Sequence, residues 1–392
     1  MINFDNTEIA FASKSNKDLK RAYWLFKMIG NSVLVNLGKR LTNIALTLSL
    51  PIKGIIKNTI FKQFCGGETI SDSSETIEQL AVHNVKTILD YSVEGKESID
   101  DFEATTSEII STIKTGAKNP NIPFAVFKIT GISRFSILEK ANDNNSELTE
   151  DDKLEITATL DRIDRICKAA YDYQQPLFVD AEESWIQDFI DRTVRLMMAK
   201  YNIERVIVYN TIQIYRHDRL SFLKKEIKQA KEAGFKLGIK LVRGAYMEKE
   251  RARAEERGYP SPIQPDKLRC DEDFDNAIKL MLENLDHLAI CAGTHNENSS
   301  MLLANLIQDK GIEKSDERIY FAQLLGMSDH ISFNLAHNGY NVAKYVPYGP
   351  IGEVMPYLMR RADENTSVSG QTSRELSLII KERKRRRAIK EK

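Results

Sequence analysis

The sequence predicts a (β/α)8 barrel of the TIM type with an N-terminal helical arm. Eight short β-rich runs alternate with helical segments over roughly 270 residues, which matches such a barrel in count and length. Polar residues directly follow these runs, and barrel enzymes place their catalytic groups at that end of the strands. A doubly wound sheet is the alternative, but it would normally have a Gly-rich GxGxxG turn after an early strand, which is not found here.

The first segment, residues 1–80, is expected to form the helical arm. Helices are expected at 19–35, 41–50 and 55–64, and the Gly66-Gly67 pair ends the last of them. Basic residues accompany the apolar ones, so the arm could lie on an anionic membrane surface. An ordinary arm that packs on the domain is the favoured interpretation.

The barrel domain is expected at residues 81–375, with helices at 185–201, 221–233 and 274–284 among those between its strands. The expected strands are residues 85–91, 124–130, 176–180, 205–211, 236–242, 288–292, 318–322 and 342–346. A basic tail, residues 376–392, follows and is expected to be a solvated helix end. A non-enzymatic alternative is a protein that binds membrane or nucleic acid through the KRRR run of this tail.

Composition limits the class of protein. The 392 residues, 42% of them hydrophobic, suffice for one large domain or a few ordinary ones. The 56 basic residues equal the 56 acidic ones, so the whole-chain charge does not indicate a nucleic-acid partner. The four cysteines form no CxxC pair, which predicts free thiols and no metal site. No apolar run reaches the length of about 18 residues that predicts a transmembrane helix.

The polar residues that follow the β-rich runs are the first candidates for a site. They are Asp90 and Glu94; Lys128; Asp180, Glu182 and Glu183; Gln213; Lys240, Arg243 and Tyr246; Thr294, His295 and Asn296; Gln323; and Tyr345 and Tyr348, together with the non-polar Gly244 and Leu325. Burying Lys128 or Lys240 within an apolar strand is costly unless the ammonium is paired or faces an anion. For any one of these residues, a solvated side chain in a loop is the favoured interpretation. Their occurrence at eight successive strand ends, however, indicates a functional site.

The run YLMRRADEN adds a possible receptor for a carboxylate. Tyr357 lies three and four residues before Arg360 and Arg361, and Glu364 follows them by four and three, so these residues share one helix face. Two adjacent guanidinium groups beside an aromatic ring suit a small carboxylate, because each offers a planar fork of donors. The alternative is a solvated helix face with one ion pair.

The residues alone leave the chemistry open. Cations, carboxylates and tyrosines suit an anionic cofactor beside a small carboxylate substrate. Schiff-base chemistry through Lys128 or Lys240 is equally compatible with them. No Ser or Cys nucleophile stands beside a base in an elbow-like motif.

Several motifs resemble the proline dehydrogenase family. They are VDAEE, KLVRGAY, THNEN, FAQLLGM, YVPYGP and YLMRRADEN, in family order between residues 85 and 365. The runs KLVRGAYMEKERARA and YVPYGP are most similar to the monofunctional type found in mitochondria. The resemblance implies a distorted (β/α)8 barrel with FAD in its mouth. Such an enzyme oxidises L-proline to Δ1-pyrroline-5-carboxylate by hydride transfer to flavin N5 and passes the electrons to a membrane quinone.

The resemblance also implies roles for individual residues. Lys128, Arg360 and Arg361 would bind the proline carboxylate, and Glu94 would pair with Arg360 to close the site. The implied substrate and catalytic residues are Glu94, Lys128, Asp180, Tyr246, Leu325, Tyr345, Tyr357, Arg360 and Arg361. The implied FAD-binding residues are Gln213, Lys240, Val242, Arg243, Gly244, Ala245, Thr294, His295, Asn296, Gln323 and Glu364. Lys240 stands where other members have Arg, and Met247 stands where many bacterial members have Trp.

The implied setting is the first step of proline catabolism. The product would be released to a separate pyrroline-5-carboxylate dehydrogenase, and no nucleic-acid partner is expected. The protein would be cytoplasmic with peripheral contact to the inner membrane if bacterial, or at the mitochondrial inner membrane if eukaryotic. Hydroxyproline dehydrogenase is the nearest alternative, although a hydroxyl at ring C4 would press on the Tyr345 phenol. A Schiff-base barrel aldolase is a more distant alternative.

Overall fold

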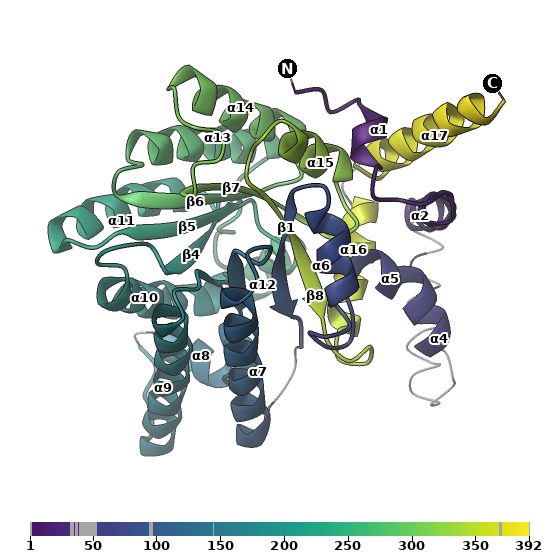
Figure 1. Cartoon of the computed structure of the whole chain (residues 1–392). Coiled ribbons are helices and arrows are strands. Elements are labelled where there is room, and N and C mark those ends of the chain that lie inside the picture. Colours follow the sequence, from purple (N-terminus) through teal and green to yellow (C-terminus); the bar gives the residue numbers. More distant parts are fainter. Residues whose placement is uncertain are drawn as a thin grey trace. The chain divides into compact units, whose positions relative to one another are not determined.

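The structure, a computed structural model, describes residues 2–31, 35, 38, 53–93, 97–143, 145–367 and 371–391. Its eight parallel strands follow one another in sequence order around a closed barrel. Figure 1 shows β4, β5 and β6 side by side. The strands are β1 Val85–Tyr91, β2 Phe124–Phe127, β3 Leu177–Val179, β4 Val208–Gln213, β5 Leu237–Val242, β6 Leu288–Gly293, β7 Ile319–Leu324 and β8 Val342–Tyr348. The predicted (β/α)8 barrel is confirmed.

All eight predicted runs contain a strand, although most boundaries shift by one to three residues. Two of these shifts have a local reason. Strand β2 ends at Phe127, three residues early, because Lys128 starts a 3-10 turn. Strand β4 begins at Val208 rather than residue 205. There the side-chain oxygen of Asn202 accepts hydrogen bonds from the amides of Ile207, at 2.9 Å, and Val208, at 2.8 Å. Because a side chain binds these two amides, they do not pair with a neighbouring strand, and β4 starts later than predicted.

The chain forms two compact units, residues 1–94 with 323–392 and residues 95–322. We refer to them as the terminal unit and the central unit. The predicted domain boundaries after residues 80 and 375 stay predictions. The central unit contains helices α7 Ile99–Ala117, η2 Ile129–Gly131, α8 Phe135–Asn142, α9 Glu150–Asp172, α10 Ser184–Tyr201, α11 Arg219–Ala233, α12 Met247–Arg257, α13 Lys267–Glu283 and α14 Glu297–Asp309.

Strand register brings the candidate residues of the central unit to one edge of its sheet. Gln213, the last residue of β4, pairs with Val242, the last residue of β5. Lys240 pairs with Thr211 of β4 and Cys291 of β6. Because parallel strands end at the same edge, the residues that follow β3, β4, β5 and β6 share that edge.

The terminal unit contains the pair of strands β1 and β8, from Val85↔Val342 to Tyr91↔Tyr348. Its helices are α1 Thr7–Ala10, α2 Asn16–Ile29, α4 Lys53–Ile56, η1 Lys57–Phe61, α5 Lys62–Phe64, α6 Ser74–Ala81, α15 Asp329–His337, α16 Met355–Ser367 and α17 Gln371–Lys390. The expected helix at 19–35 ends as α2 at Ile29, and the expected helix at 41–50 lies outside the described residues.

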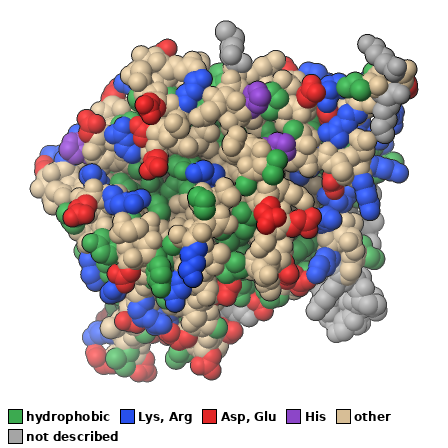
Figure 2. Space-filling view, viewed as in Figure 1, with side chains coloured by type: hydrophobic (Ala, Val, Ile, Leu, Met, Phe, Trp, Pro, Cys, Tyr) green, Lys and Arg blue, Asp and Glu red, His purple; other side chains and the backbone are tan. Residues whose placement is uncertain are grey.

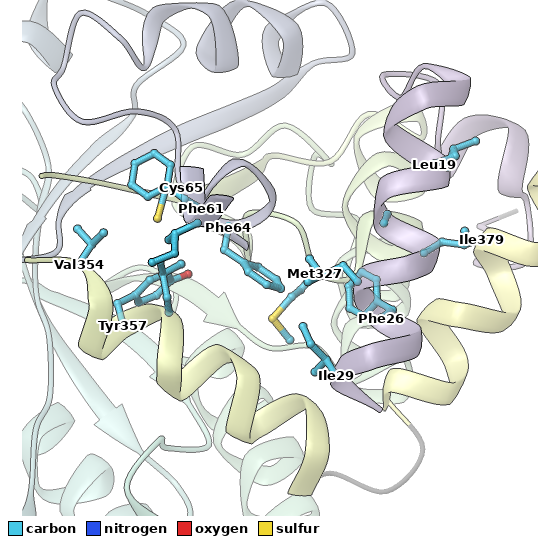
Figure 3. Packing of buried hydrophobic residues seen from close by; sticks show 14 of the residues in the cluster. Leu19, Phe26, Ile29, Phe61, Phe64, Cys65, Met327, Val354, Tyr357 and Ile379 are labelled. Atoms are coloured by element: carbon cyan, nitrogen blue, oxygen red, sulfur yellow. The ribbon is translucent and has the colours of Figure 1, made fainter. Parts of the chain in front are cut away.

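A hydrophobic cluster joins the N-terminal arm to helices α16 and α17 (Figure 3). Phe26 of α2 and Phe64 of α5 meet edge to face, with ring centroids 6.4 Å apart. Tyr357 of α16 and Ile379 of α17 belong to the same cluster. This packing agrees with the interpretation of an ordinary packed arm. Among the described helices, none has the length and apolar character that crossing a bilayer requires.

The basic C-terminal segment is a helix with one buried face. Glu382 of α17 is fully buried and binds Arg385 and Arg386. The Arg386 guanidinium also donates to the carbonyl oxygens of Phe11, at 2.9 Å, and Lys14, at 2.8 Å. The expectation of a solvated helix end is therefore wrong for this face, because the N-terminal segment supplies acceptors for its arginines. Other basic side chains remain visible over α17 in Figure 2.

Candidate functional site

In the central unit, Asp180 and Lys240 form an ion pair between residues 60 positions apart. Asp180 directly follows β3 and Lys240 lies within β5. The Lys240 side chain is 6% exposed and that of Asp180 is 15% exposed. The ammonium also lies 5.6 Å from the ring centroid of Phe178. A lysine within an apolar strand was expected to have a charged partner, and Asp180 is that partner for Lys240.

Arg243, just after β5, is held by three polar groups. Its guanidinium donates to Asp271 at 2.8 Å, to the hydroxyl of Thr294 at 2.7 Å and to the hydroxyl of Ser299 at 3.0 Å. The Phe274 ring lies beneath it, 4.3 Å from the guanidinium carbon. The guanidinium plane is therefore oriented before any ligand binds, which favours recognition of a planar or phosphorylated anion.

The loop after β6 leads into the N-terminus of helix α14. The Thr294 hydroxyl accepts from the Asn296 amide at 3.1 Å. The side-chain oxygen of Asn296 accepts from the amides of Asn298, at 2.9 Å, and Ser299, at 3.1 Å, and so caps the helix. His295 is half-buried between the two. Arg243, Thr294 and Asn296 are thus joined in one hydrogen-bonded group.

Gln213 and Gly244 test whether this edge suits a flavin nucleotide. The Gln213 side chain is buried, and its oxygen has no hydrogen-bond partner among the described residues. Such an acceptor is costly unless a ligand donates to it. Gly244 has φ of +134°, and a Cβ atom there would lie 2.5 Å from the Tyr215 ring. The Tyr215 ring therefore explains why glycine occupies this position. The Gln213 acceptor is the feature that fits the implied FAD.

Lys128 lies half-buried at the end of β2, beside a buried carboxyl group. Burial raises the pKa of Glu182 to about 7, although the Lys128 ammonium and hydrogen bonds from Thr130 oppose that rise. The Thr130 hydroxyl donates to Glu182 at 2.5 Å and its amide does so at 3.1 Å. The charge of Lys128 therefore faces a group that titrates near neutrality.

In the terminal unit, helix α16 carries the tyrosine and arginines of the predicted carboxylate receptor. Tyr357 and Arg361 are buried, and the Arg361 guanidinium carbon lies 5.1 Å from the centroid of the Tyr357 ring. Arg360 is half-buried. The alternative of a solvated helix face is wrong for Arg361, because its side chain is enclosed by the packed unit. Glu364 lies in α16, but its side chain is outside the described part of the structure.

Two further candidates of the terminal unit, Leu325 and Tyr345, are bonded to each other. The Leu325 amide donates to the Tyr345 carbonyl oxygen at 2.8 Å. Both side chains are 7% exposed. Gln323 is buried at the end of β7, and its side-chain oxygen accepts from the Ser332 hydroxyl at 2.7 Å. Glu94, the predicted partner of Arg360, lies outside the described residues.

Sequence reasoning missed several residues that hold the candidates in place. Asp271 and Ser299 bind Arg243 from helices α13 and α14, and no motif linked them to it. Val242 ends β5, and Ala245 and Tyr246 directly precede α12. Glu182, by contrast, was already among the polar residues that follow the predicted strand at 176–180.

The chain is similar to proteins of one enzyme family. A family model described as proline dehydrogenase matches residues 73–374. Proline dehydrogenase 1, mitochondrial, of Dictyostelium discoideum is 33% identical over 426 residues, which cover 97% of this chain and 74% of that relative. Hydroxyproline dehydrogenase of Xenopus laevis is 28% identical over 412 residues, which cover 96% of this chain and 88% of that protein.

A solved structure supports the fold. Proline utilization A (PutA) from Bdellovibrio bacteriovorus, inactivated by N-propargylglycine, superposes with a TM-score of 0.72 and 19% identity. The superposition covers 92% of this chain and 38% of the PutA chain. The family match covers most of the chain and includes the candidate residues from Glu94 to Glu364. The chain therefore belongs to the proline dehydrogenase family of oxidoreductases.

Proposed function

We propose that this protein oxidises L-proline to Δ1-pyrroline-5-carboxylate with FAD as its cofactor. The observation that carries the proposal is the buried guanidinium of Arg361 beside the Tyr357 ring, within the segment that matches the family. A buried guanidinium favours a carboxylate ligand, and an aromatic ring favours the methylenes of a small ring. L-Proline combines both features.

Basic and apolar side chains are the proposed substrate contacts. In the terminal unit, Arg360 and Arg361 bind the substrate carboxylate, while Leu325, Tyr345 and Tyr357 contact the ring. In the central unit, Lys128 adds a positive charge for the carboxylate, and Tyr246 contacts the substrate. A guanidinium orients a carboxylate through two parallel hydrogen bonds, which limits the substrate to few orientations.

The central unit supplies most of the proposed FAD site. Gln213 and Lys240 contact the flavin ring, with Asp180 orienting the Lys240 ammonium. The remaining parts of the cofactor are bound by Val242, Arg243, Gly244, Ala245, Thr294, His295, Asn296, Gln323 and Glu364. When bound, FAD supplies an acceptor for the hydride from proline C5 and a carrier of electrons to a membrane quinone. A lysine ammonium beside the flavin stabilises the negative charge of the reduced form.

The proposed partners follow from this chemistry. A quinone accepts the electrons, which requires peripheral contact with a membrane, and a separate pyrroline-5-carboxylate dehydrogenase uses the product. The location is mitochondrial if the chain is eukaryotic, as in the name of the Dictyostelium relative, and the cytoplasmic side of the inner membrane if it is bacterial. Reduction of a quinone in liposomes by the full chain tests this part of the proposal.

An absorbance spectrum tests the main proposal. The purified protein should be yellow, and L-proline added without oxygen should bleach the flavin bands. A colourless protein, or flavin bands that L-proline leaves unchanged, would contradict it. Trapping of a lysine adduct by borohydride would instead favour the Schiff-base aldolase.

Hydroxyproline oxidation is the second candidate function, because one similar protein is named hydroxyproline dehydrogenase. The Tyr345 side chain is a bulky phenol, and we expect it to exclude a hydroxyl group from ring C4. We therefore expect kcat/KM to be higher for proline than for hydroxyproline. The reverse order, measured with purified protein, would establish the second candidate.

A further inference from the structure

The turn between strand β7 and helix α15, residues 325–328, has an unusual backbone. Gly326 has φ of +77° and Ser328 has φ of 51°, so two of its four residues are left-handed. A left-handed backbone at a non-glycine residue such as Ser328 persists only where surrounding contacts hold it. The turn carries Leu325, one of the proposed substrate contacts. We call residues 325–328 the Leu325 turn.

The first of these contacts comes from strand β8. Lys344 is fully buried, and its ammonium donates to the carbonyl oxygens of Leu324, at 3.3 Å, and Met327, at 2.5 Å. It also pairs with Asp329, the first residue of α15, at 2.9 Å. A buried ammonium is tolerated only when its donors are satisfied, and here they are satisfied by the turn and by the residues directly before and after it.

The second contact comes from the C-terminal helix. Glu375 of α17 is buried and accepts a hydrogen bond from the Ser328 amide, 47 residues earlier in the chain. Its carboxylate also lies 3.9 Å from the Nδ1 atom of His330. A carboxyl oxygen that accepts from the amide of a left-handed residue stabilises that backbone directly. Helix α17 thus binds the end of the Leu325 turn.

The third contact comes from the N-terminal arm. The side-chain amide of Gln63, in α5, donates to the Gly326 carbonyl oxygen at 2.9 Å. A Cβ atom on residue 326 would lie 2.1 Å from the Gln63 carbonyl oxygen. The arm backbone therefore lies directly against the turn, and only glycine leaves room for it.

We propose that Lys344 and Glu375 are positioning residues for the substrate site. They hold the Leu325 turn by its backbone, so that Leu325 keeps its place beside Tyr345, to whose carbonyl oxygen its amide is bonded at 2.8 Å. Helix α17 therefore contributes to substrate recognition indirectly, because its Glu375 holds the turn that carries Leu325. This inference rests on the proposed function of Leu325 as a contact of the proline ring.

Glu375 offers the sharpest experiment, with Glu382 as its matched control. Both are buried carboxyl groups on α17, but Glu382 binds Arg385 and Arg386 of its own helix, whereas Glu375 binds the turn. Replacement of Lys344 would leave Asp329 buried without its ammonium and could prevent folding. The test therefore uses Glu375→Leu, Glu375→Gln and Glu382→Leu in the full-length flavin-loaded enzyme.

We expect Glu375→Leu to raise KM for L-proline about tenfold, with a smaller change in kcat, because the turn loses its anchor but the reacting groups remain. Glu375→Gln should restore KM, since its amide oxygen still accepts from Ser328. Glu382→Leu should lower the Tm but leave KM unchanged.

Two results would overturn the inference: an unchanged KM in Glu375→Leu, or an equal rise of KM in Glu382→Leu. Wild-type protein that fails to oxidise L-proline would instead overturn the proposed function, and this inference with it. Activity of the wild-type enzyme therefore separates the two failures.

Discussion

The amide of Leu325 donates a hydrogen bond of 2.8 Å to the carbonyl oxygen of Tyr345. The bond joins the turn after β7 to the middle of β8, so two proposed contacts of the substrate ring share one backbone connection. Their side chains are equally buried, at 7% exposure. A change at either residue is therefore expected to affect how the ring is recognised.

Tyr345→Ser is expected to shift substrate preference. Removal of the phenol opens space near the substrate ring and removes an apolar contact, so KM for L-proline should rise about tenfold. Discrimination against hydroxyproline should fall, because its hydroxyl no longer meets the phenol. Steady-state kinetics on both substrates measure the effect, and an unchanged ratio of kcat/KM would show that Tyr345 does not face the ring.

Arg361→Met is expected to weaken binding of L-proline. Loss of a charge-assisted hydrogen bond to the carboxylate should raise KM by roughly tenfold to hundredfold, with a smaller effect on kcat. The matched control is Arg383→Met, because the Arg383 guanidinium carbon lies 4.4 Å from the Tyr23 ring in a similar stack. Equal kinetics of the two variants would contradict the assignment of Arg361.

Gln213→Leu is expected to have opposite effects on the flavin-free and flavin-bound protein. The buried Gln213 oxygen has no partner among the described residues, so Leu should raise the free energy of unfolding of the flavin-free protein by about 1 kcal/mol. The same change should weaken flavin binding, measured by fluorescence titration.

Gln323→Leu is the control for this prediction. The Gln323 oxygen accepts from Ser332 at 2.7 Å, so its loss should destabilise the flavin-free protein. If Gln213→Leu destabilised that protein as well, the Gln213 oxygen would have a partner within the protein rather than in the cofactor.

Gly244→Ala is expected to destabilise the protein more than Gly234→Ala. Both glycines have positive φ, but only at residue 244 would a Cβ atom meet the Tyr215 ring, at 2.5 Å. Strain alone should cost about 1 kcal/mol at Gly234, and overpacking should add roughly 1–3 kcal/mol at Gly244. Urea unfolding measures both free energies, and equal losses would mean that the Tyr215 ring moves aside freely.

Glu182 is expected to make stability fall as the pH rises from about 4.5 to about 7. Burial raises its pKa from 4.5 to about 7, so the folded protein holds a proton that the unfolded chain releases in this window. The stabilisation is complete below pH 4.5 and is lost as the pH passes the folded pKa. The loss amounts to about 3 kcal/mol.

Glu182→Gln provides the measurement, because a neutral amide does not titrate. The difference in unfolding free energy between the wild type and this variant should change with pH across the window, in favour of the variant at higher pH. A difference that is constant from pH 5 to about 8 would mean that Glu182 is ionised throughout.

The eight strands were predictable because their signal is local. Short β-rich runs with a polar residue at the end indicate strands wherever they pack, so each predicted run contains one. The boundary of β4 was not predictable, since it depends on the Asn202 side chain binding two amides. Helix α13 begins at Lys267, before the expected residue 274, because Asp266 caps it by accepting from the Arg269 amide.

The candidate site was only partly predictable, as two lysines illustrate. Lys240 and Lys344 both interrupt apolar strands, but only Lys240 was selected. Lys344 immediately precedes Tyr345, so the alternation of a strand sends their side chains to opposite faces, and Lys344 binds Asp329 and the Leu325 turn. A lysine within an apolar strand predicts that its ammonium has a buried partner, but the sequence does not identify the carboxylate that pairs with it.

The sequence was enough to predict the barrel, the family and the groups available for chemistry. Strand patterns and motifs each involve only a few neighbouring residues, so they can be recognised without the tertiary structure. The pairing of charges was decided by folding: Asp180 with Lys240, Asp271 with Arg243, and Glu375 with the Ser328 amide. These partners are distant along the chain, and the strength of an ion pair depends on separation in space and on burial. Packing of the strands and helices sets both quantities.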